Sequence, residues 1–527
     1  MGEIRSRNGK GFQLLAGIIM VALLLAGCSG GNGNKPDAES NGGDGGNGAK
    51  AEANAPANGG NAGDGGELEP VELIYYYPAS KVERDTQMVE DEINKLVQPK
   101  INATVRLKPV DFGNYETKLN TIMTANEAFD LAFSAHWTGN FYGNSRKGAF
   151  MEITDEMVKQ YLPKTSEILP PDFWEAAKVD GKGYMIPSYQ QAFYMEGFQV
   201  QKKLADKYGL DASTIKNWLD WEPFLKQVKE NEKDIMPVNT KVGGIYVYQN
   251  LVQLYGGNIV VSMDDPTKVL YGAELESRRS ELERDRRWVQ EGLIDPDPAL
   301  DKTRGDDLKN GKYAVTATNA MLPMPTFTAN GIEWVNIPLS KPYTSQDAIT
   351  AAGTVVSRTS KNPERALMFV ELLNTDRELY NLLCFGIDGK HYKKIDDTHI
   401  EQIKDGGYDP NTKWVHGNTF NAYFVQDEPD DMREIIKKTN EEAKPLLNSG
   451  FRFNEEKVKT EWANASAVDS DVGAILSSGT VDVDAYLKKY IDAQKKAGVD
   501  KVIAEAQAQW DEFLKSKGPE WFDRSYK

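Results

Sequence analysis

The sequence contains little cysteine, little histidine and a deficit of positive charge. Its 527 residues include two cysteines and four histidines. So few of these residues exclude a disulfide scaffold and a cysteine-rich metal site, and we expect neither a metal ion nor a cofactor. Lys and Arg number 62 against 79 Asp and Glu, which gives a net charge of -17. Nucleic acid is therefore excluded as a partner, because its phosphates would be repelled.

The common short motifs of enzymes are also missing from the part that is expected to fold. It has no G-x-S-x-G, no H-E-x-x-H and no phosphate-binding G-x-x-x-x-G-K-[ST]. A G-x-G-x-x-G match at residues 43–48 has neither a strand before it nor a helix after it. The acidic stretch at residues 295–301 contains prolines and lacks the glycine and glutamate of a calcium loop, which predicts a plain acidic turn.

The N-terminus has the pattern of a targeting signal. Basic residues precede an apolar segment at residues 12–27, which is short for a membrane-spanning helix. The segment ends in Leu25-Ala26-Gly27-Cys28, which resembles the lipobox of bacterial lipoproteins. This resemblance implies a lipid on Cys28 and a location on the extracytoplasmic face of the cell membrane. A plain signal peptide or a membrane anchor that happens to end in cysteine is the alternative.

The residues that follow Cys28 are almost entirely Gly, Asn, Ala and Asp as far as about Gly66. Such a composition has no apolar surface to bury, and it predicts a disordered, flexible tether. The folded part then begins with alternating patterns of strand and helix. Strands are expected at residues 71–77, 103–110 and 129–134, and helices between them at residues 82–97 and 115–123. Right-handed crossovers predict a parallel sheet, with ligands at the carboxyl ends of its strands.

The rest of the chain predicts further strands and helices. Strands are expected after Gly311, at residues 332–338 and at residues 348–357, and Asn362 with Pro363 is typical of a helix start. Trp218, Trp221 and Cys384 are interpreted as core residues. The chain shows no internal repeat, and the alternation of patterns indicates two lobes with more than one crossing between them.

Several segments together resemble a known family. The lipobox, the Gly-rich tether and VELIYYYP are similar to family 1 extracellular solute-binding proteins of ABC importers. The segments DGKGYMIP, LKNGKYAV and FGIDGKHY look more narrowly like the LipO-type lipoproteins of Gram-positive bacteria. The resemblance implies an α/β, two-lobed periplasmic-binding-protein-like fold of type II, with hinge strands joining the lobes. It also implies a small-molecule solute, usually a carbohydrate, and permease subunits as membrane partners.

In these terms the chain divides into six expected parts. They are a signal peptide (1–27), the lipidated Cys28 with its tether (28–67), two parts of lobe I (68–186 and 312–379) and two parts of lobe II (187–311 and 380–527). Hinge residues are expected near Pro187, Gly311 and Leu379.

A carbohydrate site needs aromatic faces for sugar rings and polar side chains for hydroxyls. The candidate stacking residues are Tyr76, Tyr77, Trp137, Tyr189 and Tyr246, and the candidate polar residues are Asp111, His136, Gln190, Asn319 and Asp388. Tyr76 and Tyr77 point to opposite faces of their strand, so at most one is expected to face a ligand. Asp388 and His391 form either part of the site or a structural hairpin.

The functional hypothesis is a monomeric, lipid-anchored receptor of an ABC importer that captures an oligosaccharide between two closing lobes. It needs no catalytic residue. Two alternatives remain open at this point: a binding protein for peptides or another non-sugar solute, and a surface-anchored glycoside hydrolase or lyase.

Overall fold

The computed structural model describes residues 68–239, 247–256, 258–294, 307–308, 310–426 and 428–526. The part of the chain after Gly66 forms one compact unit. The predicted signal peptide, Cys28, the tether, Tyr246 and the acidic stretch at residues 295–301 lie outside the described residues.

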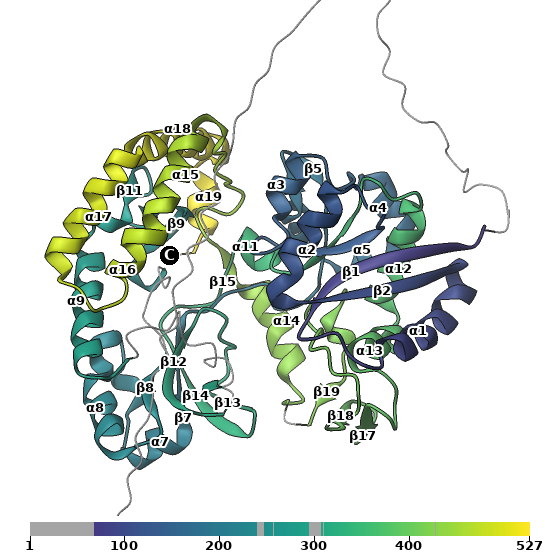
Figure 1. Ribbon diagram of the computed structural model, residues 1–527, viewed down its shortest axis with the longest axis horizontal. Helices are drawn as coiled ribbons and strands as arrows, with labels where there is room; N and C mark the ends of the chain where they lie inside the picture. Colours follow the sequence, from purple (N-terminus) through teal and green to yellow (C-terminus); the bar gives the residue numbers. More distant parts are fainter. Residues whose placement is uncertain are drawn as a thin grey trace, which may run out of the picture. The chain divides into compact units, whose positions relative to one another are not determined.

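The first lobe is built on a five-stranded sheet with the order β2-β1-β3-β16-β6 (Figure 1). The strands β1, β2 and β3 run parallel, whereas β16 is antiparallel to both β3 and β6. Their bounds are Val71–Ala79 (β1), Ala103–Asp111 (β2), Leu131–Ser134 (β3), Ile186–Pro187 (β6) and Gly353–Val356 (β16). The parallel β-α-β-α-β start expected from the sequence is therefore confirmed.

Helices and short strands surround this sheet. The helices are α1 (Thr86–Ile101), α2 (Phe112–Thr124), α3 (Phe141–Arg146), α4 (Asp155–Tyr161), α5 (Pro163–Ile168), α6 (Pro171–Ala176), α11 (Gln346–Ile349), α12 (Pro363–Thr375), α13 (Arg377–Phe385) and α14 (Met432–Glu442). The short strands are β4 (Lys178–Val179), β5 (Lys182–Gly183), β17 (Tyr392–Lys394), β18 (His399–Gln402) and β19 (Phe424–Val425). Asn362 and Pro363 begin α12, as expected.

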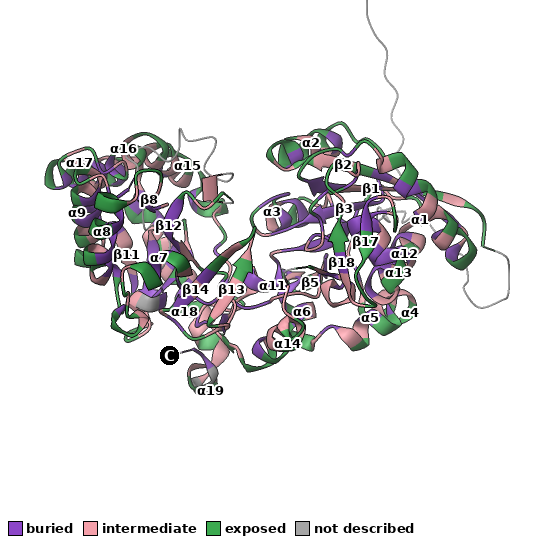
Figure 2. Ribbon diagram, turned by 90° about the horizontal axis from the view of Figure 1, so that it is seen from below, coloured by how far each residue is buried: buried purple, intermediate pink, exposed green. Residues whose placement is uncertain are grey.

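Side chains of β1 alternate between the two faces of the sheet, and both faces are covered. Tyr75 and Tyr77 are fully buried, and Tyr75 contacts Phe369 of α12. The ring of Tyr76 lies on the other face, 6.0 Å from Nζ of Lys118 on α2. Figure 2 shows the strands of this sheet mostly as buried ribbon. A strand that is covered on both faces needs a nearly continuous apolar sequence, which explains VELIYYY.

The second lobe contains a second five-stranded sheet, β13-β14-β7-β12-β8, and a three-stranded sheet, β11-β10-β9. The strands are β7 (Gly197–Gln201), β8 (Met236–Val238), β9 (Leu251–Tyr255), β10 (Ile259–Ser262), β11 (Val269–Tyr271), β12 (Tyr313–Thr318), β13 (Thr326–Ala329) and β14 (Ile332–Pro338). The helices are α7 (Lys202–Lys207), α8 (Glu222–Asn231), α9 (Glu276–Gln290), α15 (Lys459–Val468), α16 (Ala474–Leu476), α17 (Val483–Ala497), α18 (Val499–Lys517) and α19 (Pro519–Arg524).

The cores explain two further sequence features. Trp218 and Trp221 are buried around Phe198 of β7, which confirms them as core residues. Cys384 is buried in α13, and burial raises the pKa of its thiol to about 12. A thiol that stays protonated is a poor nucleophile, so this cysteine is a packing residue, as expected.

The chain crosses between the lobes at residues 188–196, 339–344 and 443–446. The short strands β15 (Tyr343–Thr344) and β20 (Lys444–Pro445) pair in parallel, and Tyr194 pairs with Tyr343 through two backbone hydrogen bonds of 2.8 and 2.9 Å. The buried carboxylate of Glu196 accepts a hydrogen bond from the Tyr343 hydroxyl at 3.0 Å. The three crossing segments therefore lie side by side.

These crossings differ from the expected boundaries. Pro187 is next to the first crossing, but Gly311 precedes β12, which pairs with β7 and β8 inside the second lobe. Leu379 lies in α13, buried in the first lobe. The chain therefore returns to the first lobe after β14 and not at residue 312, and it leaves again after α14 and not at residue 380. Local patterns of strand and helix do not reveal which sheet a strand joins, so the sequence misplaced both boundaries.

Candidate functional site

The carboxyl edge of the first sheet carries a group of aromatic rings. Phe112 is the first residue of α2 after β2, Trp137 follows β3, and Trp414 comes from the loop after β18. Phe112 stacks on Trp414 with ring centroids 5.7 Å apart and 13° between the planes. Trp137 lies 5.9 Å from Trp414. We call Phe112, Trp137 and Trp414 the aromatic platform.

The aromatic platform packs against the core on one side, and Trp137 is exposed to solvent. Buried Phe133 of β3 lies 5.6 Å from Trp414 and 6.2 Å from Trp137. The indole N–H of Trp137 donates to the carbonyl of Ala351 at 2.8 Å, which sets the orientation of the ring. Even so, half of Trp137 is exposed (50%). A large indole that is held in place yet exposed to solvent is typical of a binding surface and not of a core.

Polar groups border the platform. Asp111 is exposed and caps α2, accepting hydrogen bonds from the Gly113 amide at 3.0 Å and the Asn114 side chain at 3.3 Å. On the next loop the hydroxyl of Thr138 donates to the carboxylate of Glu116 at 3.3 Å. The platform edge thus offers carboxylate and amide groups that can bind hydroxyls.

His136 lies beside a charged pair that links the two lobes. Arg452 of the second lobe donates to Asp347 of α11 at 2.5 Å and to the Tyr142 hydroxyl of α3 at 2.7 Å. Its guanidinium also lies 4.4 Å from the centre of the Tyr142 ring. Burial lowers the pKa of His136, although the Asp347 carboxylate partly opposes this effect. Burial alone would raise the pKa of Asp347, but the Arg452 charge holds it below its usual value.

Removing this link should loosen the contact between the lobes. Replacing Arg452→Met removes the ion pair, the bond to Tyr142 and the cation–π contact. Because the pair is only partly buried, we expect a loss of about 1–2 kcal/mol in the free energy of unfolding. Urea unfolding of Arg452→Met, Asp347→Asn and the double variant measures it. The two single losses should not add, and full additivity would show that the two side chains are not coupled.

The structure brings only part of the predicted site together. Asp111, His136 and Trp137 all lie at the carboxyl edge of the first sheet, where strands β2 and β3 end. Tyr77 is buried in the core, where no solute reaches it, and Tyr76 packs on the face covered by α2. Their strand ends at Ala79, two residues beyond Tyr77, so neither residue reaches the sheet edge.

The remaining candidates lie elsewhere. Tyr189 and Gln190 are half-buried at the start of the first crossing, where Tyr189 contacts Phe420 at 4.7 Å and the Gln190 carbonyl accepts from Asn440 at 2.9 Å. Asn319 is exposed at the end of β12 in the second lobe. Asp388 lies in a turn whose backbone closes on Tyr392, which supports the hairpin interpretation, and His391 is buried beside Asp85.

Trp414 and Arg452 are two residues of the site region that were not among the predicted candidates. Trp414 is separated from Trp137 by more than half of the folded chain and stands in a loop without periodicity. Its only local signal is an aromatic residue among polar ones in TKWVHG. Arg452 is one of many charged residues, and only the fold places it against the first lobe.

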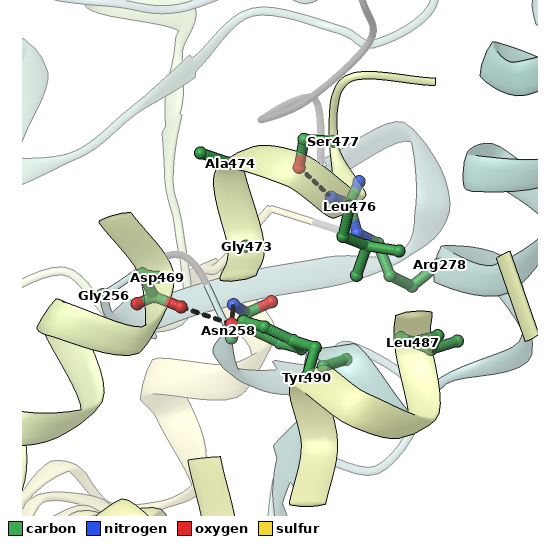
Figure 3. A pocket seen from close by; sticks show the side chains of 11 residues that line it. Gly256, Asn258, Arg278, Asp469, Gly473, Ala474, Leu476, Ser477, Leu487 and Tyr490 are labelled. Atoms are coloured by element: carbon green, nitrogen blue, oxygen red, sulfur yellow. Dashed lines mark hydrogen bonds between the residues drawn. The ribbon is translucent and has the colours of Figure 1, made fainter. Parts of the chain in front are cut away.

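A small cavity lies away from the aromatic platform. It has a volume of about 300 Å³, lies within the second lobe and is lined by Arg278, Asn258, Asp469 and Tyr490 (Figure 3). There Tyr490 and Asp469 point toward each other and are hydrogen-bonded. Among the described residues, no group of three His, Cys, Asp or Glu side chains could hold a metal ion. Nor is any helix of the described ranges long and apolar enough to span a bilayer.

Two α/β lobes, paired crossing segments and an exposed aromatic platform at a sheet edge define a solute-binding protein of the two-lobed class. The chain belongs to the bacterial extracellular solute-binding protein family, whose sequence model matches residues 87–378. A second sequence model, for a domain of unknown function (DUF3502), matches residues 448–515. The family binds solutes and is not a family of enzymes, which settles the choice between a binding protein and a hydrolase.

A relative and a solved structure, both from Streptococcus pneumoniae, are similar over most of the chain. A carbohydrate ABC transporter substrate-binding protein from serotype 4 is 28% identical over 439 residues, which is 80% of this chain and 87% of that protein. The crystal structure of the N-glycan transport solute-binding protein NgtS matches with a TM-score of 0.73 and 25% identity, covering 85% of this chain and all of NgtS. The alginate-binding protein AlgQ2 shares the fold, with a TM-score of 0.57 and 18% identity over 84% of this chain and 98% of AlgQ2.

Proposed function

We propose that the protein is the lipid-anchored receptor of an ABC importer and that it captures an oligosaccharide. The observation that carries the proposal is the aromatic platform at the carboxyl edge of the first sheet. A flat indole offers a π-face to the C–H groups of a sugar ring, and Asp111 with its neighbours can bind hydroxyls. Permease subunits are the membrane partners that this role requires.

The similar proteins narrow the class of solute. NgtS has been crystallised with Man1GlcNAc and with Man5GlcNAc, and these chains share 26% of their residues with ours over 84% and 85% of its length. We therefore propose an oligosaccharide that contains mannose or N-acetylglucosamine as the first solute to test. The two lobes close around it, and the paired crossing segments at residues 188–196, 339–344 and 443–446 bend.

A calorimetric titration tests this function. The chain from residue 28 onward, with Cys28→Ser, is titrated with mannose- and N-acetylglucosamine-containing oligosaccharides, with other oligosaccharides and with oligopeptides. Binding of one sugar series, with the sugar recovered unchanged, supports the proposal. Binding of peptides without binding of any sugar would contradict the carbohydrate assignment. It would not affect the assignment to the solute-binding protein family.

The lipid anchor makes a separate prediction. Replacing Cys28→Ser removes the only side chain of the lipobox that can carry a lipid, so the protein should appear in the culture medium instead of the membrane fraction. Cell fractionation with immunodetection measures this shift in a Gram-positive host. Ser29→Ala is the matched control and should stay with the membrane. Retention of the Cys28→Ser protein in the membrane would show that the apolar segment itself is the anchor.

A further inference from the structure

A cavity of about 630 Å³ lies where the two lobes meet, apart from the aromatic platform. The first lobe contributes Tyr142, Asp172 and Gln346 to its lining, and the second lobe contributes Lys517 and Trp521. The crossing segments add Thr344 and Pro445 to the lining. This volume falls within the range of small-molecule sites, which is about 300–1,000 Å³. All these residues belong to the described ranges.

The charges around the cavity largely cancel. Arg146 forms two hydrogen bonds with Asp180, at 3.1 and 3.2 Å, and Lys178 pairs with Glu175 at 2.6 Å. Among the residues that line the cavity, the charged groups without an ion pair are one cation, Lys517, and one carboxylate, Asp172. A lining with balanced charge does not favour a strongly charged ligand.

The polar groups that remain call for a ligand that can both donate and accept hydrogen bonds. Lys517 donates and Asp172 accepts. Just beneath the surface, the side-chain carbonyl of Gln346 and Nε of Arg452 are buried without a hydrogen-bond partner. Because these two atoms are closed off from the cavity, an occupant forms its hydrogen bonds with Lys517 and Asp172 instead. Hydroxyl groups satisfy donors and acceptors alike.

Two aromatic side chains complete the lining. Trp521 of α19 is held by a hydrogen bond from its indole N–H to the Leu447 carbonyl at 3.1 Å, and Lys517 lies 4.5 Å from the ring centre. Tyr142 lies on the first-lobe side. Rings at the cavity wall suit the C–H faces of a pyranose. We infer that this cavity is a second site, which binds one or two rings of a neutral saccharide.

Because both lobes and two crossing segments line the cavity, an occupant contacts parts that move when the lobes close. It therefore favours one arrangement of the lobes and changes the affinity at the platform, and the platform ligand changes the affinity of the cavity by the same factor. This coupling rests on the proposed function of the platform, whereas binding in the cavity does not.

The test separates the two sites. The chain from residue 28 onward, carrying Cys28→Ser and Trp137→Ala, is titrated calorimetrically with N-acetylglucosamine, mannose, maltose and cellobiose, and with free amino acids. We expect binding of at least one saccharide in the millimolar range. Adding Lys517→Ala or Trp521→Ala should weaken it about 5- to 30-fold, which corresponds to the loss of one aromatic or charged contact.

Lys515→Ala is the matched control, because Lys515 lies on the same helix, is paired with Glu512 and does not line the cavity. It should leave saccharide binding unchanged. Trp521→Ala also removes the hydrogen bond that holds α19 and could unfold the protein. In that case the result of Lys517→Ala is the one that tests the inference. Absence of saccharide binding, equal binding by the Lys517→Ala and Lys515→Ala variants, or binding of amino acids alone would overturn the inference. The platform proposal is tested separately. It fails if oligosaccharides bind the chain with Trp137 and the Trp137→Ala variant with equal affinity.

Discussion

Replacing Trp137→Ala should abolish most oligosaccharide binding while leaving the protein folded. The substitution removes the indole of the platform that is half exposed to solvent, and truncation of such an anchor costs about 2–4 kcal/mol, or about 30- to 1,000-fold in Kd. Because half of the side chain is already in water, the unfolding midpoint should change little. Titration calorimetry gives the affinity, and circular dichroism gives the stability.

Two variants show whether the aromatic face itself is responsible. Trp137→Phe keeps a ring but loses the bond to the Ala351 carbonyl, so its affinity should lie between those of the wild type and Trp137→Ala. Trp174→Ala removes a half-buried tryptophan of the first lobe that lies outside the platform, and it should bind like the wild type. An unchanged affinity in Trp137→Ala would remove the platform from the solute site.

Stability should fall steeply as the pH drops below about 6.5, because His416 is buried as a neutral ring. It lies between Tyr75 and Tyr77, and its Nδ1 is 2.9 Å from the Tyr75 hydroxyl. Burial lowers the pKa of His416 to about 3. Below pH 6.5 the unfolded chain therefore binds a proton at His416 that the folded chain does not bind. From this residue alone, the free energy of unfolding decreases by about 1.4 kcal/mol for each pH unit of acidification. Between pH 6.5 and pH 3 the loss approaches about 4 kcal/mol.

Urea unfolding at several pH values measures this slope. His416→Asn removes the titrating ring and should flatten the dependence between pH 6 and pH 4.5, whatever its effect on stability at neutral pH. Tyr75→Phe removes the hydrogen-bond partner but keeps the imidazole, so it should be less stable with an unchanged slope. The lowered pKa values of His136 and His391 add to the same dependence, and they persist in both variants. An equal slope in the wild type and His416→Asn would show that this histidine does not control acid stability.

The first third of the fold could be predicted because its signals are local. The segment VELIYYY is apolar throughout, as a strand covered on both faces must be, and the helices around it show apolar spacing at three and four residues. Trp137 was found in the same way, because it directly follows a predicted strand among polar neighbours. The sequence therefore indicated the sheet edge and one of its aromatic rings.

The rest of the site depends on contacts that no local pattern encodes. Trp414 stacks on Phe112, which lies about 300 residues earlier in the chain, and Arg452 meets Tyr142 across a similar separation. Tyr77 was misplaced for a related reason: the strand continues to Ala79, so the residue stays inside the sheet and does not reach its edge. Strand β12 was assigned to the wrong lobe. Its apolar sequence would suit pairing with β16 in the first lobe as well as the observed pairing with β7 in the second lobe, so the sequence does not distinguish the two.

The order of strands in the first sheet also constrains how the protein is made. Strand β16 stands between β3 and β6, although it follows β3 by more than 200 residues in the chain. During synthesis the first lobe cannot close its sheet until this late strand has emerged, and the second lobe waits for α15 to α18. Such long-range pairing is slow. A chain that must thread through a membrane pore before it folds benefits from this delay, because its early segments hold no finished lobe that would block passage.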